Sequence, residues 1–293
     1  MRYLDPESLS KIKNLRFVPV RGLAEGAYSG MHRSAYKGSS QEFMEHREYV
    51  PGDEIKYIDW KVYARKERFF VRLYREEKNL RSYFLLDASG SMAYKSPRAS
   101  RPAKFEYACR LAMGMAYLIL RQTDSVGLGV FSDAPKLFLA PDNQMAQLER
   151  LDQALAGVVP QGKTDMEGGL SYYAQLLHRR SLAVIFSDLM GPAEKIQAVI
   201  RALKAHKHEV LVFHVLDPLE RDFDFEGPVL FDPLEGGEPL RCDAHLLKEA
   251  YRREFAELIK YYTASFHSSE IGYATVYTDQ PWEGALKVAL GKQ

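Results

Sequence analysis

Long hydrophobic runs are missing from this sequence of 293 residues. The longest strongly apolar stretch, residues 111–120, is about half as long as the roughly 20 residues that a membrane-spanning helix needs. The first residues also lack the apolar core and the small-residue cleavage site of a secretory signal. We therefore expect a cytoplasmic protein without a membrane span.

Cysteine and strong charge of one sign are scarce as well. The two cysteines, Cys109 and Cys242, lie far apart and lack the spacing of zinc ligands, so neither a disulfide framework nor a zinc site is implied. The formal net charge is +1, but residues 1–82 hold 17 basic against 12 acidic side chains, and the remainder holds 23 against 27. This imbalance suggests two electrostatically distinct parts. It is too mild to indicate nucleic-acid binding, which needs a concentrated basic face.

The chain from residue 83 onward alternates short apolar runs with longer helical patterns. The candidate strands are 83–87, 126–131, 136–140, 182–187, 209–215 and 273–278, and their continuous apolar character fits strands buried on both faces. Helices are expected at 103–122, 145–157, 166–180, 193–206, 244–267 and 282–290. The alternation predicts an α/β fold with a doubly wound, mostly parallel six-stranded sheet of the Rossmann type.

Two segments depart from the regular alternation. The turn at residues 132–135 is too short for a crossover helix, so the second and third strands should form one antiparallel edge hairpin. Residues 217–242 are rich in Asp, Glu, Gly and Pro, which predicts an acidic excursion or hairpin on the functional rim of the sheet.

Residues 1–82 follow a different pattern. Aromatic and β-branched runs, separated by turn residues, occupy 43–50, 57–64 and 68–76 and predict extended, mainly β structure. Residues 28–40 are expected to form a loop. We therefore divide the chain into a mainly β segment, 1–82, and a sheet domain, 83–293.

Oxygen-bearing side chains follow the first strand of the predicted sheet. The strand ends at Asp87, and the next residues supply Ser89 and Ser91. Loops at the carboxyl ends of parallel strands form the crevice where ligands bind, so these three side chains should converge on one site. The pattern Asp-x-Ser-x-Ser is common by itself, but its position at the end of a predicted strand makes it informative.

Two further residues extend this set. Thr164 precedes a predicted helix, and Asp188 directly follows the strand 182–187. Both should lie on the rim beside Asp87. The five residues offer two carboxylates and three hydroxyls without His or Cys, which suits Mg²⁺ or Mn²⁺ in oxygen coordination. Taken singly, Thr164 is equally typical of a helix N-cap, and Asp188 of the start of a turn.

The five residues together resemble the metal-ion-dependent adhesion site of von Willebrand factor A domains. The resemblance implies that Ser89, Ser91 and Thr164 touch the metal, and that Asp87 and Asp188 act directly or through water. It also implies that an Asp or Glu of a protein partner fills the open coordination position.

The first part of the chain carries a second resemblance. Its signature consists of Glu42-Phe43, Arg47-Glu48-Tyr49, Pro51-Gly52-Asp53, Ile58-Asp59-Trp60 and Ala64-Arg65. It is similar to that of the family called domain of unknown function 58, in which this stretch precedes an A-type domain. The resemblance implies an α/β interaction domain that accompanies AAA+ ATPases of the MoxR type in chaperone-like or complex-assembly work.

The charged residues of this signature allow two interpretations. Arg47, Asp53, Asp59 and Arg65 could form a partly buried ion-pair network, which is costly unless complete. Alternatively, the segment is a docking face for a partner, with Trp60 and its neighbour Tyr63 as aromatic anchors.

An enzyme, and a purely structural scaffold with an empty site, are the alternatives to a binding module. A Mg²⁺-dependent phosphatase or phosphotransfer enzyme would use Asp87 as nucleophile, but enzymes of the haloacid dehalogenase type need a second acid where this chain has Ser89. A Gly-x-Ser-x-Gly elbow with a His partner is also missing. The sequence therefore favours a metal-dependent protein-interaction module without catalytic activity.

Overall fold

The computed structural model describes residues 1–17, 41–51, 53, 55, 58–76, 80–97, 101–178, 180–225 and 227–290. The chain divides into two compact units. Unit 1 comprises Met1–Ala27 and Leu80–Gln293, and unit 2 comprises Tyr28–Asn79. Among the described residues, no helix is both long and apolar enough to cross a membrane.

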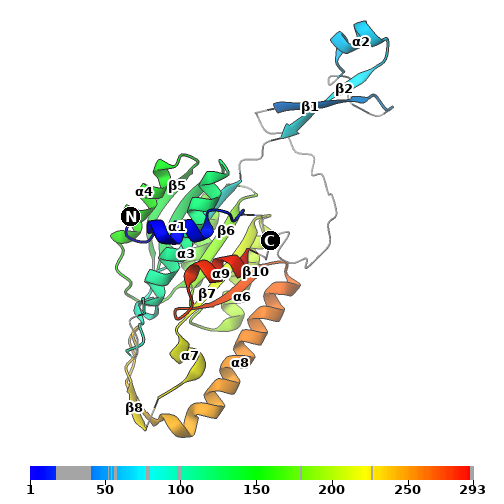
Figure 1. Cartoon of the computed structure of the whole chain (residues 1–293). Coiled ribbons are helices and arrows are strands. Elements are labelled where there is room, and N and C mark those ends of the chain that lie inside the picture. The colour runs from blue at the N-terminus through cyan, green and yellow to red at the C-terminus, as the bar shows by residue number, and fades with distance from the viewer. Residues whose placement is uncertain are drawn as a thin grey trace. The chain divides into compact units, whose positions relative to one another are not determined.

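A six-stranded sheet forms the centre of unit 1 (Figure 1), with the strand order β10-β7-β6-β3-β4-β5. The strands are β3 (Arg81–Asp87), β4 (Ser125–Phe131), β5 (Pro135–Asp142), β6 (Leu182–Ser187), β7 (Glu209–Leu216) and β10 (Gly272–Tyr277). All neighbours run parallel except β4 and β5, which pair antiparallel at one edge. The prediction of a mostly parallel six-stranded sheet with one antiparallel edge hairpin is confirmed.

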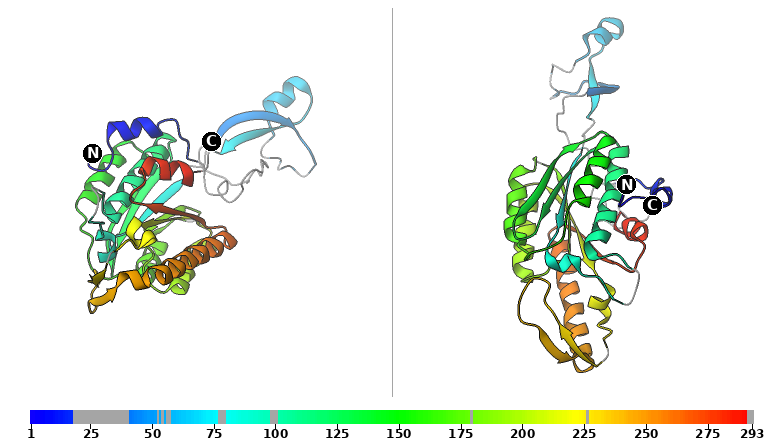
Figure 2. Two further views of the ribbon diagram at one scale, coloured as in Figure 1. Left: turned by 60° about the horizontal axis from the view of Figure 1, so that its bottom comes forward. Right: turned by 90° about the vertical axis from the view of Figure 1, so that its left-hand side faces the viewer.

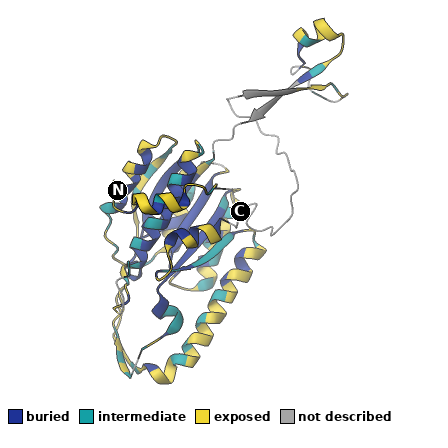
Figure 3. Cartoon of the chain, in the orientation of Figure 1, coloured by how far each residue is buried: buried dark blue, intermediate teal, exposed yellow. Residues whose placement is uncertain are grey.

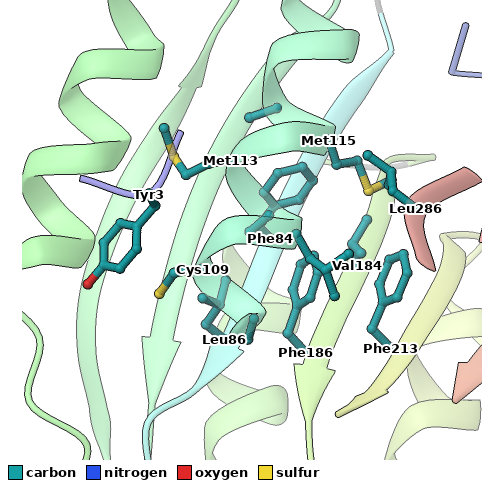
Figure 4. Close-up of a cluster of buried hydrophobic side chains, with 14 of the residues drawn as sticks. Tyr3, Phe84, Leu86, Cys109, Met113, Met115, Val184, Phe186, Phe213 and Leu286 are labelled. Atoms are coloured by element: carbon teal, nitrogen blue, oxygen red, sulfur yellow. The ribbon is translucent and has the colours of Figure 1, made fainter. Parts of the chain in front are cut away.

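Apolar side chains cover both faces of this sheet because successive residues of a strand point to opposite sides. On β3, Phe84 and Leu86 belong to one buried cluster, and Tyr83 and Leu85 belong to the other. Figure 4 shows the first cluster, where Phe84 packs beside Phe186 of β6. A strand buried on both faces needs a continuous apolar run, which is the pattern that the sequence displays.

Helices cover each face, so the sheet is doubly wound (Figure 2). The first cluster takes buried residues from α1 (Pro6–Ile12), α3 (Lys104–Arg121), α4 (Ala146–Ala156) and α9 (Trp282–Ala289). The second takes them from α5 (Met166–Leu176), α6 (Ala193–Ala205) and α8 (Ala244–Ser268). The outward sides of these helices are exposed (Figure 3).

The acidic excursion contains the short helix α7 (Pro218–Asp222) and two antiparallel strands, β8 (Pro228–Phe231) and β9 (Leu240–Asp243). The hairpin prediction for 217–242 is therefore confirmed. Because α7 follows the end of β7 closely, the excursion begins at the edge of the sheet where the parallel strands end. The β8–β9 hairpin, α7 and the first turns of α8 lie together in Figure 1.

The first residues of the chain belong to unit 1, which differs from the predicted division at residue 82. Tyr3, Leu4, Ile12 and Phe17 are buried in the first cluster. The backbone N–H of Tyr3 donates to Asp152 Oδ1 of α4 over 3.0 Å. The helix α1 is amphipathic and too short to be stable alone, so it depends on this packing.

Unit 2 combines two strands with a helix that the sequence did not predict. The antiparallel strands β1 (Gln41–Glu48) and β2 (Phe70–Glu76) agree with the predicted β structure. The expected extended run at 57–64 is wrong, because α2 spans Trp60–Lys66. The Asp59 side chain caps this helix by accepting from the N–H groups of Lys61 and Val62. The predicted loop at 28–40 lies outside the described residues.

Charged residues of the signature make side-chain contacts within the described part of unit 2. Arg47 donates to both carboxylate oxygens of Asp53 over 2.7 and 2.8 Å, in an exposed position. Asp59 contacts His46 Nε2 over 2.9 Å, and Arg65 is exposed on α2. The exposed Arg47–Asp53 pair adds little stability, whereas Asp59 is buried.

Replacing Ile12 by alanine tests whether the first helix is part of the sheet domain. Ile12 is fully buried, so Ile12→Ala should lower the free energy of unfolding of unit 1 by about 2–5 kcal/mol. Urea denaturation measures the loss. Lys13→Ala, at an exposed neighbouring position, is the control. Equal stability of the two variants would show that the segment does not contribute to the core.

Candidate metal site

The site begins at Asp87, the last residue of β3. Its carboxylate is fully buried. One oxygen accepts the backbone N–H of Ser89 over 2.9 Å, and the other accepts the hydroxyl of Ser187 over 2.7 Å. Ser187 ends the neighbouring strand β6. The two strands thus present polar groups at the same edge, as expected for parallel neighbours.

The two serines that follow Asp87 lie in the short 3₁₀ helix η3 (Gly90–Ala93) and its N-cap. The hydroxyl oxygens of Ser89 and Ser91 are 3.1 Å apart, and both residues are buried. Gly90 lies between them where three chain segments meet. A Cβ there would be 2.4 Å from the Leu234 carbonyl oxygen and 3.1 Å from that of Gly162, so only glycine fits.

Thr164 is brought to the serines by backbone hydrogen bonds between neighbouring loops. The N–H of Gly90 donates to Gly162 O over 2.8 Å, and the N–H of Gln161 donates to Ala88 O over 2.9 Å. The N-cap of α5 is Asp165, whose side chain accepts from the N–H of Gly168. The capping alternative for Thr164 is therefore wrong, and its hydroxyl is directed elsewhere.

The hydroxyl of Thr164 contacts a residue that the sequence analysis did not single out, Glu235. Thr164 Oγ1 donates to Glu235 Oε1 over 2.7 Å, and the Thr164 N–H donates to Oε2 over 2.9 Å. The N–H of Ser91 also donates to Oε1, over 3.3 Å. Glu235 comes from the turn between β8 and β9, within the predicted acidic excursion. Its carboxylate therefore links Thr164 to the serine loop.

Asp188 follows β6 and is held by a buried lysine. Lys104 Nζ, at the start of α3, donates to Asp188 Oδ2 and to Glu220 Oε1 of α7, each over 2.7 Å. The other Asp188 oxygen accepts the N–H of Met190 over 3.3 Å, so this residue also begins a turn. Asp188 is close enough to Asp87 to raise its pKa, but its carboxylate is engaged with Lys104.

Burial dominates the electrostatics of the site. Loss of hydration, and to a smaller extent the charge of Asp188, raise the pKa of Asp87 to about 7. The hydrogen bonds that its carboxylate accepts from Ser187 and Ser89 lower the pKa, but by less. Burial lowers the pKa of His214 to about 4, so this ring is neutral at pH 7. Its Nε2 lies 2.9 Å from the backbone oxygen of Asp188. Two neighbouring buried carboxyl groups favour the approach of a cation.

The donors at this edge fit a hard cation. Asp87, Ser89, Ser91, Thr164 and Glu235 form a continuous series of contacts, and every side chain in it offers oxygen. Across the parts of the chain that the structure describes, no group of three or more His, Cys, Asp or Glu residues could hold a metal. A metal here would thus depend on hydroxyl oxygens, which suit Mg²⁺ or Mn²⁺.

Two site residues were missed for different reasons. Glu235 belongs to the acidic segment 217–242, which the sequence placed on the functional rim of the sheet. Its position beside Thr164, however, depends on how the β8–β9 hairpin folds. Lys104 carried no signal, because a lysine at the start of a helix is usually exposed.

Replacing Lys104 by methionine should destabilise unit 1 by about 3–5 kcal/mol, because Asp188 and Glu220 would remain buried without their cation. Burial already raises the folded pKa of Glu220, and the loss of the Lys104 charge would raise it further above the unfolded pKa. A carboxyl group whose pKa is higher in the folded state makes the protein less stable as pH rises from the unfolded pKa through the folded pKa.

The defect should therefore be largest above pH 7 and smaller near pH 5, as measured by urea denaturation at each pH. Lys195→Met, at an exposed position on α6, serves as the control. A pH-independent defect would contradict this interpretation of Lys104.

Known proteins are similar to this chain over much of its length. The uncharacterized protein Rv1480 of Mycobacterium tuberculosis (strain ATCC 25618 / H37Rv) is 26% identical over 268 residues, which cover 87% of this chain and 82% of the relative. The solved structure of the conserved hypothetical protein BatB from Bacteroides thetaiotaomicron is similar over 72% of this chain and 95% of its own, with a TM-score of 0.44 and 16% identity. The SpRpn10 VWA domain is similar over 74% and 98%, with a TM-score of 0.43 and 12% identity.

A family model matches most of the chain. The model described as "Protein of unknown function DUF58" matches residues 45–264, which span unit 2 from within β1 and unit 1 as far as the last turns of α8. The match covers well over half of the sequence and agrees with the signature of the first part. The chain therefore belongs to the DUF58 family.

Proposed function

We propose that unit 1 is a metal-dependent protein-interaction module. Ser89, Ser91 and Thr164 touch Mg²⁺ or Mn²⁺, and Asp87 and Asp188 act directly or through water. The observation that carries this proposal is the carboxylate of Glu235, which is bound by the hydroxyl of Thr164 and the N–H of Ser91. The rim of the sheet is thus built to receive a carboxylate, the group that a partner would present.

The donor set supports an open and attractive site. Bound there, the metal would supply a positive centre with a coordination position for one more oxygen ligand. The chain contributes three neutral hydroxyls, which bind without cancelling positive charge. Asp87 contributes a carboxylate that is kept from water and oriented by the N–H of Ser89 and the hydroxyl of Ser187.

Catalysis by Asp87 is the weaker proposal. Both oxygens of its carboxylate accept hydrogen bonds within the protein, and the residue has no exposed surface. A nucleophile must reach the phosphorus atom of its substrate. The residue two positions later is Ser89, which cannot serve as the second acid. We therefore place binding ahead of phosphate-ester hydrolysis.

Unit 2 offers a second contact surface. Trp60, Tyr63 and Phe69 are 57%, 37% and 44% exposed, and the rings of Tyr63 and Phe69 stack with centroids 4.5 Å apart. Exposed aromatic clusters are typical anchors of protein interfaces.

From the family resemblance, we propose that the partner is a MoxR-type AAA+ ATPase and that the pair works in complex assembly.

Calorimetry on chelator-treated protein tests the metal site. The wild type should bind Mg²⁺ or Mn²⁺ in preference to Zn²⁺, and Asp87→Ala should lose most of the heat because a charged ligand is gone. Asp142→Ala removes a carboxylate that pairs with Arg150 and lies beside the start of β4, at the end of the strands opposite to Asp87, and should bind like the wild type. Equal heats from all three proteins would rule the site out.

Capture of the ATPase tests the function. Immobilised protein should retain a MoxR-type ATPase in Mg²⁺, and should retain at least about tenfold less in EDTA or with Ser91→Ala. Asp142→Ala is again the control. Retention that is equally strong in all conditions would contradict the metal-bridged mechanism.

Metal-dependent hydrolysis of p-nitrophenyl phosphate that disappears in Asp87→Asn would instead favour the enzyme.

A further inference from the structure

The hairpin turn between β8 and β9 reaches back to the candidate metal site. Its Glu235 carboxylate receives hydrogen bonds from Thr164 and Ser91, which are both proposed metal ligands. The backbone of the preceding residue, Leu234, lies against Gly90 so closely that a side chain at Gly90 would collide with it. A segment far along the chain thus covers the position at which a partner should bind.

The apolar contacts of this cover with the rest of unit 1 include Phe231, whose ring centroid lies 5.8 Å from that of Phe223 and 5.3 Å from that of Phe225. The strands β8 and β9 have four residues each and, within the described residues, form a two-stranded sheet with each other. Leu230, Leu234 and Leu240 are 53%, 54% and 60% exposed. An isolated two-stranded hairpin is only marginally stable in water. Moving its tip away from the site would therefore expose little additional apolar surface.

An apolar pocket of about 700 Å³ lies directly beside Glu235. Its walls include the aromatic residues Phe223, Phe225, Phe231 and Tyr251, and it reaches Ser91 of the metal site. The rings of Phe223 and Tyr251, both in its lining, stack with centroids 4.2 Å apart. Its volume matches pockets that enclose apolar groups. A partner bound at the metal would reach this pocket with its neighbouring side chains.

We propose that Glu235 is an internal substitute for the partner's carboxylate, and that the partner displaces it with an acidic residue flanked by large apolar residues. One coordination position cannot hold two carboxylates, so the partner and the hairpin turn compete. The partner's carboxylate replaces that of Glu235, so this exchange contributes little net affinity. The net affinity comes from the partner's apolar side chains, which enter the pocket. This inference rests on the proposed metal-dependent function and adds the chemistry of the partner.

Mn²⁺ alone provides the first test. If Glu235 faces the metal, Glu235→Ala should admit an additional water to bound Mn²⁺, which raises the water-proton relaxation rate, and should weaken Mn²⁺ binding about tenfold. Glu238→Ala removes the same charge from an exposed position in the same turn and should behave as the wild type.

A probe peptide, acetyl-Leu-Glu-Leu-amide, provides the second test. In saturating Mn²⁺ it should bind Glu235→Ala at least about tenfold more tightly than the wild type, because the competitor is gone. The peptide with Gln in place of Glu should not bind. In the Glu235→Ala background, Leu247→Asp places a charge in the pocket and should abolish peptide binding, whereas Leu246→Asp, outside the pocket, should not.

The outcomes separate this inference from the proposed function. Absence of Mn²⁺ binding in the wild type would overturn the proposed function and, with it, this inference. Normal Mn²⁺ binding with unchanged relaxation and equal peptide affinity in Glu235→Ala would overturn only the role of Glu235. Peptide binding that is unaffected by Leu247→Asp would overturn the assignment of the apolar pocket.

Discussion

One buried ammonium group joins the segments that build the rim of the sheet. The side chain of Lys104 is 1% exposed and bonds to Asp188 after β6 and to Glu220 of α7. A buried charge is tolerated only when its hydrogen bonds are complete, and losing any partner is costly. This requirement holds the start of α3, the end of β6 and the start of the excursion in one arrangement. Glu235 lies within that excursion, in the turn between β8 and β9, so its position depends on this arrangement.

The sheet and most of the site residues could be predicted because their signals are local. A strand buried on both faces must be apolar throughout, so each strand of unit 1 appears in the sequence as an uninterrupted run. Polar residues directly after such runs lie at one edge by the geometry of parallel strands. Asp87, Ser89 and Ser91 are therefore found together, and Thr164 joins them through a carboxylate that the sequence analysis had not considered.

The remaining features depend on contacts between distant segments. The burial of Ile12 requires α3 and α9, which follow it by about ninety residues or more. The helix α2 was missed because its aromatic and β-branched residues favour strands, and the cap formed by Asp59 outweighed that preference. The partners of Lys104 and Glu235 lie 71 to 144 residues away along the chain, and no local pattern encodes such a pairing.

The charge balance of the rim explains why hydroxyls suit the proposed function. Fully ionised, the carboxylates of Asp87, Asp188 and Glu220 with the ammonium of Lys104 carry a formal charge of −2, which a divalent cation would balance. Additional acidic ligands in place of the serines would leave the site negative and would repel a further carboxylate. Neutral serine and threonine hydroxyls complete the coordination without that repulsion. A carboxylate from this chain or from its partner can then bind at the same edge.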